Sequence, residues 1–244
     1  MYASVIEKNP TVRTTHGQIR GQNRRGIAVF RGIPYGHDCD GKNRFLPAGP
    51  ANDWDGVRDC IKNGPVAMQR AGSISGGDNP LAKYFSGGHP EEIGWEDEVF
   101  SENCLVLNVL TPGLDDKMRP VVVYIHGGGF MSGSGTLTLG ADVWCDEEDI
   151  VVVGINHRLN AFGYLYLGAF NDQYARSGAA GMSDCVLALE WVRENIASFG
   201  GDPDKVTIMG ESGGGCKVNA LCAMESAKGL FRAAIVESGS GRPG

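Results

Sequence analysis

The run Gly210-Glu211-Ser212-Gly213-Gly214 has the residue types of a site for nucleophilic catalysis. An apolar, β-branched run at 206–209 precedes it, and residues 213 to about 224 can form a helix. In a G-x-S-x-G nucleophile elbow a strand turns at once into a helix, and small residues allow the close approach that exposes the serine hydroxyl. The helix N-terminus favours the negative charge that develops in acyl transfer. We therefore predict Ser212 as the nucleophile.

Two other interpretations of this segment are a glycine-rich turn without chemistry and a phosphate-binding loop. The phosphate-binding motif requires G-x-x-x-x-G-K-[ST] between a strand and a helix. Here Cys216 intrudes before Lys217, and Val218 stands where a magnesium-binding hydroxyl is needed. The flanking elements favour the nucleophile over both interpretations, and we expect neither a cofactor nor a metal.

A second glycine-rich segment, His126-Gly127-Gly128-Gly129-Phe130, directly follows the apolar run at 121–125. Backbone N–H groups in such a loop can bind the oxyanion of an acyl-transfer intermediate. The loop precedes the elbow by roughly 80 residues, which is the order expected for such a site. The two segments together are a more specific signal than either one.

The elements that position these segments are predicted from apolar periodicity. Continuous apolar runs of this kind suit strands buried on both faces of a parallel sheet, and they lie at 121–125, 150–153, 206–209 and 233–236. An apolar stripe at three- or four-residue steps indicates a helix, and it is formed by Val186, Leu189, Val192, Ile196 and Phe199. Gly200, Gly201 and Pro203 end that helix. We predict an α/β fold with a mostly parallel central sheet and helices on both faces.

The first hundred residues differ in character. Residues 11–16, 18–20 and 27–31 predict a small antiparallel meander, with a polar turn at 22–25. Residues 34–103 look mostly irregular, and a segment of this length suggests a wall or a lid over a site. The acidic residues between 91 and 102 are interpreted as a solvated loop, and the alternative is an acidic rim of the site that attracts cations.

Composition excludes several functions. The formal net charge of −7 disfavours binding to nucleic acid. No apolar run approaches the roughly 20 residues that span a bilayer, and the first residues lack the pattern of a secretory signal. Seven cysteines without a C-x-x-C pair suggest reduced thiols and a cytoplasmic protein. The run His37-Asp38-Cys39-Asp40 predicts a polar loop, because four adjacent ligands cannot all face one metal ion.

The sequence resembles the type B carboxylesterase family, which includes the cholinesterases, and in style the bacterial para-nitrobenzyl esterases. Besides the two glycine-rich segments, the resemblance runs through Gly32-Ile33-Pro34-Tyr35, Arg44-Phe45, Ser101-Glu102-Asn103-Cys104-Leu105, Leu107-Asn108-Val109, Asn156-His157-Arg158-Leu159, Phe199-Gly200-Gly201-Asp202-Pro203 and Glu237-Ser238-Gly239-Ser240.

The resemblance implies an α/β-hydrolase fold, with residues 1–244 as the N-terminal portion of a single domain whose C-terminal part is missing. It implies ester hydrolysis through an acyl-enzyme on Ser212. Gly128, Gly129 and Gly213 would supply the oxyanion-hole N–H groups. Glu211 would line the substrate pocket, and Ser238 would support the triad.

Three positions depart from the family pattern. His157 replaces a frequent tyrosine, and Gly213 replaces a common alanine, which would loosen one oxyanion donor. Secreted members pair the cysteine matching Cys104 with one where Ala67 stands here, so that disulfide is not expected. We interpret the missing disulfide as consistent with a reducing compartment.

The triad of the family is incomplete in this sequence. The family order is serine, then an acid, then a histidine, but all five histidines here precede Ser212. Within the sequence, Glu237 could substitute for the missing acid, and His126 or His157 for the missing base, but all three fit these roles less well than residues in the family order. We therefore expect these residues alone to hydrolyse esters very slowly and to be poorly soluble. The expected partners of the chain are a small-molecule ester substrate and a complementing C-terminal half. A non-catalytic adhesion-type binding module and an amide or thioester hydrolase stay open as alternatives.

Overall fold

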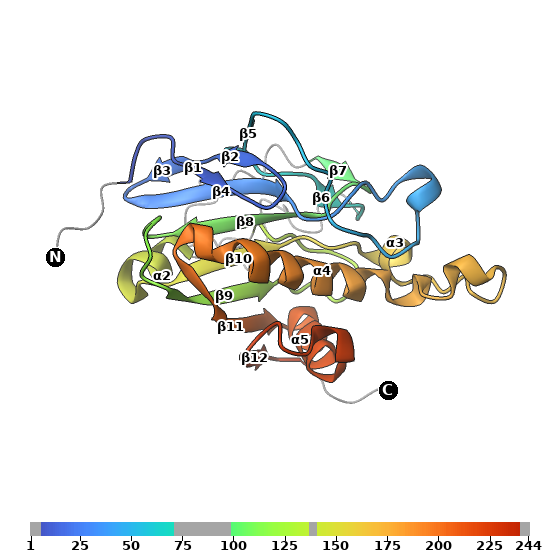
Figure 1. Ribbon diagram of the computed structural model, residues 1–244. Helices are drawn as coiled ribbons and strands as arrows, with labels where there is room; N and C mark the ends of the chain where they lie inside the picture. The colour runs from blue at the N-terminus through green and yellow to red at the C-terminus, as the bar shows by residue number, and fades with distance from the viewer. Residues whose placement is uncertain (1–5, 71–98, 137–140, 240–244) are drawn as a thin grey trace.

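A seven-stranded sheet forms the centre of the computed structural model, which describes residues 6–70, 99–136 and 141–239 (Figure 1). In spatial order the strands are β12 (Ala233–Glu237), β11 (Gly201–Glu211), β9 (Arg119–Ile125), β10 (Val151–Ile155), β8 (Val106–Thr111), β4 (Ile27–Pro34) and β3 (Gln22–Arg24). All four strands predicted from apolar runs are present in this sheet.

The sheet is parallel on one side and antiparallel on the other. β12, β11, β9 and β10 pair in parallel, whereas β10–β8, β8–β4 and β4–β3 are antiparallel. The described sheet is thus more evenly mixed than the sequence patterns indicate. In the parallel part the carboxyl ends of β9 and β11 lie side by side, so the two glycine-rich segments that follow these strands are neighbours at the same end of the sheet.

Helices cover both faces of the sheet, as predicted. Val152 packs in one apolar cluster with Cys145 of α2 (Ala141–Glu148). Its neighbours Val151 and Val153 point the other way and share a cluster with residues of α4 (Ala180–Asn195) and α5 (Gly213–Ala223). Because successive strand residues face opposite sides, α2 lies on one face and α4 and α5 on the other.

The helix predicted around 186–199 is confirmed, with a tighter last turn. α4 passes into a 3₁₀ segment, η6 (Ile196–Phe199), and Gly200 then takes a left-handed conformation with φ 76°. A glycine accepts this conformation without a steric cost, which ends the helix where the sequence indicates. Shorter helical segments are η1 (Gly41–Asn43), α3 (Asn160–Tyr164), η4 (Asp172–Tyr174), η5 (Ser177–Ala179) and η7 (Glu225–Ala227).

The prediction of one N-terminal meander is wrong in its pairing. β1 (Thr11–Arg13) and β2 (Gln18–Arg20) form a separate sheet with β5 (Val57–Asp59), whereas β3 and β4 belong to the central sheet. The polar residues 22–24, predicted as a turn, are strand β3. The turn is shifted to Arg25 and Gly26, whose positive φ values of 53° and 93° suit a two-residue hairpin.

Within residues 34–103 the described parts are mostly irregular, as predicted. Besides η1 and β5 they contain β6 (Val66–Ala67) and β7 (Phe100–Ser101), which pair with each other. Glu102 forms a bidentate ion pair with Arg44. The remainder of the acidic run, at 91–98, and the centre of the expected lid lie outside the described residues, so the lid stays a prediction.

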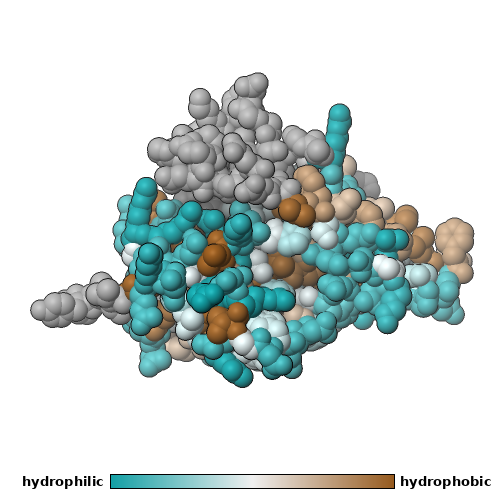
Figure 2. Space-filling model, turned by 90° about the horizontal axis from the view of Figure 1, so that it is seen from above, coloured by the Kyte–Doolittle hydropathy of each residue, from teal (hydrophilic) through white to brown (hydrophobic). Residues whose placement is uncertain are grey.

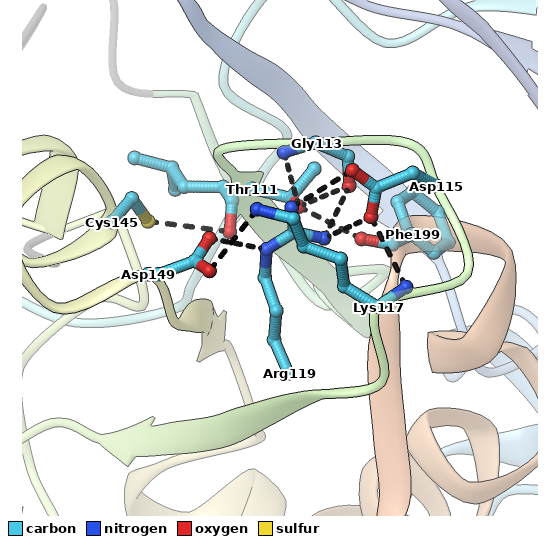
Figure 3. Close-up of polar contacts among 9 residues, drawn as sticks. Thr111, Gly113, Asp115, Lys117, Arg119, Cys145, Asp149 and Phe199 are labelled. Carbon is cyan, nitrogen blue, oxygen red and sulfur yellow. Dashed lines mark hydrogen bonds and ion pairs between the residues drawn. The ribbon is translucent and has the colours of Figure 1, made fainter. Parts of the chain in front are cut away.

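An arginine network surrounds the amino end of β9, and Figure 3 shows its polar contacts. Arg119, at the start of β9, donates to Asp115 and Asp149, with N–O distances of 2.6 Å for each. The Thr111 hydroxyl lies 2.8 Å from the Phe199 carbonyl and thus links β8 to the end of η6. None of the helices in the described residues is long and apolar enough to cross a bilayer.

Candidate active site

Ser212 occupies the turn between β11 and α5 with a strained backbone. Its φ and ψ are 55° and −117°, a combination that costs free energy for a residue with a side chain. The Ser212 N–H donates to the Glu237 carbonyl at 2.8 Å, and the Ser212 carbonyl accepts from the Cys216 N–H at 3.0 Å. Ser212 is exposed, and within the described residues its hydroxyl has no hydrogen-bond partner. The predicted strand-to-helix turn is therefore present.

Glycines make this sharp turn sterically possible. A Cβ atom on Gly210 would overlap the backbone of Gly214, and one on Gly214 would overlap the Ile125 carbonyl oxygen. The start of α5 thus rests directly on the end of β11 and on the end of β9. Any side chain at these positions would push the serine away from the edge of the sheet.

The glycine loop, which we define as residues 126–133, follows β9 and lies against the elbow. Gly128 and Gly129 have positive φ values of 82° and 66°. The backbone of Gly213 packs so closely on Gly129 that a Cβ on Gly213 would overlap its N, Cα and O atoms. The sequence led us to expect a loosely held donor at Gly213. In the structure the backbone of Gly213 is instead packed tightly against Gly129. The three residues predicted for an oxyanion hole lie together beside Ser212.

The glycine loop leaves the N–H groups of the predicted oxyanion hole available, whereas its carbonyl groups accept hydrogen bonds. Within the described residues, no acceptor is found for the N–H groups of Gly128, Gly129 and Gly213. The Gly128 carbonyl accepts from the N–H groups of Met131 and Ser132, at 3.3 and 3.1 Å. Stabilisation of a carbonyl-derived oxyanion requires unoccupied N–H groups close to the nucleophile, and these three amides meet the first condition.

Lys217 is the residue of this site that the sequence reasoning missed. Its side chain, on the second turn of α5, is completely buried. The Nζ atom donates to the Gly129 carbonyl at 2.7 Å and to the His126 carbonyl at 3.2 Å, and lies 5.1 Å from the centre of the Phe130 ring. Burial lowers the pKa of Lys217 to about 8. Lys217 is the one charged residue of α5, five residues after the nucleophile, but its partners are distant along the chain, so this local feature did not reveal its role.

Glu211, the residue before the nucleophile, faces the glycine loop, and its role in lining a substrate pocket stays a prediction. Its Oε2 atom is 3.1 Å from the position that a Cβ on Gly127 would take. Glu237 is its direct neighbour in the register of β11 and β12. Burial raises the pKa of Tyr124, and the charges of these two glutamates add to the increase. The carboxyl ends of β11 and β12 therefore carry two carboxylates, Glu211 and Glu237, at the same end of the sheet as the available amides.

Two histidines, His126 at the start of the glycine loop and His157 after β10, are built into the core. The rings of His126 and His157 are stacked, with centroids 4.6 Å apart. Burial, followed by the charge of Lys217, lowers the pKa of His126 to about 3, and burial also keeps the pKa of His157 far below its usual value. Both rings are therefore neutral, and neither is hydrogen-bonded to Ser212.

The other candidate residues lie elsewhere. His16 contacts Asp53, and the His37 ring bonds to the Asp38 carbonyl, whereas His89 is outside the described residues. No cluster of three metal-binding side chains is found in the part of the chain that the structure describes. Ser238 directly follows β12 with a φ of 52°, and its supporting role stays a prediction.

Comparisons with known proteins place the chain in a family. The sequence model of the carboxylesterase family matches residues 8–242. The para-nitrobenzyl esterase of Bacillus subtilis is 39% identical over 232 residues, which are 95% of this chain and 44% of that enzyme. A medium-chain fatty acyl-CoA hydrolase precursor of Anas platyrhynchos is 39% identical over 244 residues, covering 96% of this chain and 41% of that protein.

A solved structure supports the same placement. The carboxylesterase EST55 of Geobacillus stearothermophilus superposes with a TM-score of 0.82 at 42% identity, covering 95% of this chain and 43% of that one. The chain spans less than half the length of each of these relatives, which agrees with the N-terminal portion of an α/β-hydrolase fold. The match over 8–242 and these likenesses show that the chain belongs to the carboxylesterase family.

Proposed function

We propose that this chain carries the nucleophile and the oxyanion hole of a carboxylic ester hydrolase. The observation that carries the proposal is the exposed, strained Ser212 next to the free N–H groups of Gly128, Gly129 and Gly213. Glu211 lines the same edge and is proposed to contact the substrate. The names of the relatives, which include esterases, support the reaction class.

The proposed reaction is a two-step acyl transfer. The Ser212 oxygen attacks the ester carbonyl carbon and gives its proton to a base, and the carbonyl oxygen becomes an oxyanion held by the three amides. The C–O bond to the alcohol then breaks, and the alcohol leaves with the transferred proton. Water attacks the acyl-enzyme in the same way and releases the acid, which restores Ser212. The reaction as proposed uses no metal and no cofactor.

The base and the acid of the proposed triad come from residues outside these 244. The buried, neutral rings of His126 and His157 are not hydrogen-bonded to Ser212, and all five histidines of the sequence precede it. In a serine protease whose base is removed, turnover falls by roughly a million-fold. We therefore propose that these residues alone hydrolyse para-nitrophenyl butyrate far more slowly than a longer protein that contains the second half. Equal turnover by the two proteins would overturn this.

Apolar side chains around the glycine loop support an apolar acyl or alcohol group. Phe130 and Met131 are partly exposed next to the predicted hole, and Phe130 makes an edge contact with Tyr164 of α3. Leu165, Tyr166 and Phe170 are exposed beyond α3, and Figure 2 shows hydrophobic side chains gathered at this end of the molecule. We propose that a small-molecule ester with an apolar group binds here.

A thioester is the second substrate class. The duck relative is named as a fatty acyl-CoA hydrolase, and the same nucleophile and hole serve ester, thioester and amide cleavage. We also propose a reducing, cytoplasmic environment, because Cys104 and Cys185 are buried as thiols in the core.

Covalent labelling tests the proposal. A fluorophosphonate probe loses fluoride when a serine oxygen attacks its phosphorus, and it should label Ser212 in the chain, more rapidly in the longer protein. Ser212→Ala should abolish labelling, whereas Ser226→Ala, a change at an exposed serine of η7, should leave it intact. No labelling of the longer protein would favour the binding-module alternative. A panel of matched esters, thioesters and amides then decides the substrate class.

A further inference from the structure

Lys217 is a buried amine for which the proposed reaction has no use. Long charged side chains are seldom fully buried unless they are paired, because removing an ammonium from water is costly. Within the described residues, no carboxylate forms an ion pair with Lys217. Its closest polar partners are the two carbonyls of the glycine loop, so the cost of its burial is connected to that loop.

The two hydrogen bonds of Lys217 are placed at both ends of the glycine run. The His126 carbonyl precedes Gly127, and the Gly129 carbonyl ends the run, so that one Nζ atom bridges the segment between them. Three consecutive glycines lose much backbone entropy when they become ordered, and the loop needs a strong anchor. Hydrogen bonds from an ammonium group are stronger than those from neutral donors.

The charged and titratable groups around the amine leave its charge uncompensated. His126 and His157 face it from the loops after β9 and β10, and both are held neutral by burial. Cys185 of α4 and Cys216 of α5 are the other titratable groups near it. An uncompensated positive charge in a low-dielectric interior acts over a longer distance than one in water.

We propose that Lys217 is a positioning residue of the oxyanion hole, which anchors the glycine loop through the His126 and Gly129 carbonyls and adds positive charge behind the amides. The proposal deepens the proposed function and rests on it for the second role alone. The first role, as an anchor of the loop, holds whether or not Ser212 reacts.

The anchor is tested by amide hydrogen exchange in the 244-residue chain. Lys217→Met removes the donors and the charge, and it should raise the exchange rate of the hydrogen-bonded loop amides of Met131, Ser132 and Gly133 by about tenfold. Lys217→Arg, which keeps a charged donor, should stay closer to the wild type. The control Lys228→Met changes an exposed lysine after η7 and should have no effect. Exchange at the wild-type rate in Lys217→Met would overturn the anchor.

The charge is tested by the pH profile of Ser212 phosphonylation in the longer protein. Lys217 is charged below its lowered pKa of about 8, and above it the neutral amine keeps its N–H donors but loses the charge. The wild-type rate should therefore show an inflection near pH 8 that both Lys217→Met and Lys217→Arg lack. Lys217→Met should be about tenfold slower at pH 7, with Lys217→Arg recovering much of the loss.

The outcomes separate the two claims. A lysine that serves only the fold would change the labelling rate without removing the inflection, and that result would overturn the charge role. Absence of labelling in every variant would refute the nucleophile itself and with it the charge role, whereas the exchange experiment would still decide the anchor. An unchanged labelling rate in Lys217→Met would contradict the positioning role.

Discussion

At the scale of single residues, the contact between Gly213 and Gly129 leaves no space for a Cβ atom at position 213. The Cβ atom of an alanine at position 213 would overlap the Gly129 backbone. The loop must therefore move if a side chain is added.

We predict that Gly213→Ala lowers the rate of Ser212 phosphonylation by roughly 10²-fold, because one oxyanion donor is displaced. The measurement is the second-order rate constant of labelling in the longer protein. Gly49→Ala is the matched control, since its Cβ would meet only the His37 ring at an ordinary 3.4 Å. Equal labelling of Gly213→Ala and the wild type would show that the loop has room.

Lys217 also makes a prediction for stability. Its pKa is about 8 in the folded chain and near 10.5 when exposed, so the unfolded chain binds more protons between these values. Stability of the wild type therefore rises with pH in that window. Relative to Lys217→Met, the wild type should gain roughly 2–3 kcal/mol in unfolding free energy between pH 7 and pH 10. Urea denaturation at both pH values measures the difference, and parallel curves would contradict it.

At the scale of elements, the elbow depends on how closely α5 starts above the end of β9. Gly214→Ala would force its Cβ onto the Ile125 carbonyl oxygen, so helix and strand must separate. We predict a loss of at least roughly 1–3 kcal/mol in unfolding free energy, together with loss of labelling at Ser212. Gly49→Ala is again the control. An unchanged urea midpoint for Gly214→Ala would contradict this description of the turn.

The sequence predicted those elements whose patterns are local. The apolar runs that became β9, β10, β11 and β12 are continuous, and the stripe on α4 ends at a glycine. β8 was not predicted as a strand, because Asn108 interrupts its apolar residues. The reason for this asparagine is tertiary: its side chain accepts from the Gly32 N–H and donates to the Gly135 carbonyl.

The same limit applies to β3 and to the site. Gln22, Asn23 and Arg24 have the composition of a turn, and they form a strand because β4 offers them an edge. Ser212 and the glycine run could be found from spacing, because the elbow is a local motif. Lys217 could not, because its partners lie 88 and 91 residues away along the chain.

At the scale of the whole molecule, β12 is an open edge. All five of its residues are exposed, including Ile235 and Val236 at 43% and 39%. A cavity of about 360 Å³ is lined by Leu221, Met224 and Phe231, among others, in the segment from α5 to the loop before β12. Exposed apolar strands at an edge promote association. Because the chain spans less than half of its relatives' length, we propose that a complementing C-terminal half covers this edge.

We predict that the 244-residue chain self-associates and binds an apolar-surface dye, and that Ile235→Lys reduces both. Light scattering and dye fluorescence measure the two effects. Lys42→Met, a change at an exposed lysine of η1, serves as a control outside β12 and its neighbouring strand. A monodisperse wild-type monomer that does not bind the dye would count against an open apolar edge.

The central claim is that the hydroxyl of Ser212 and the amides of Gly128, Gly129 and Gly213 act on one carbonyl group. The most direct measurement is a crystal structure of the longer protein after phosphonylation. We predict a bond from the Ser212 oxygen to phosphorus, and a phosphonyl oxygen within about 2.7–3.1 Å of the three amide nitrogens. A phosphonyl oxygen that points away from these amides, or an adduct on another residue, would contradict the claim.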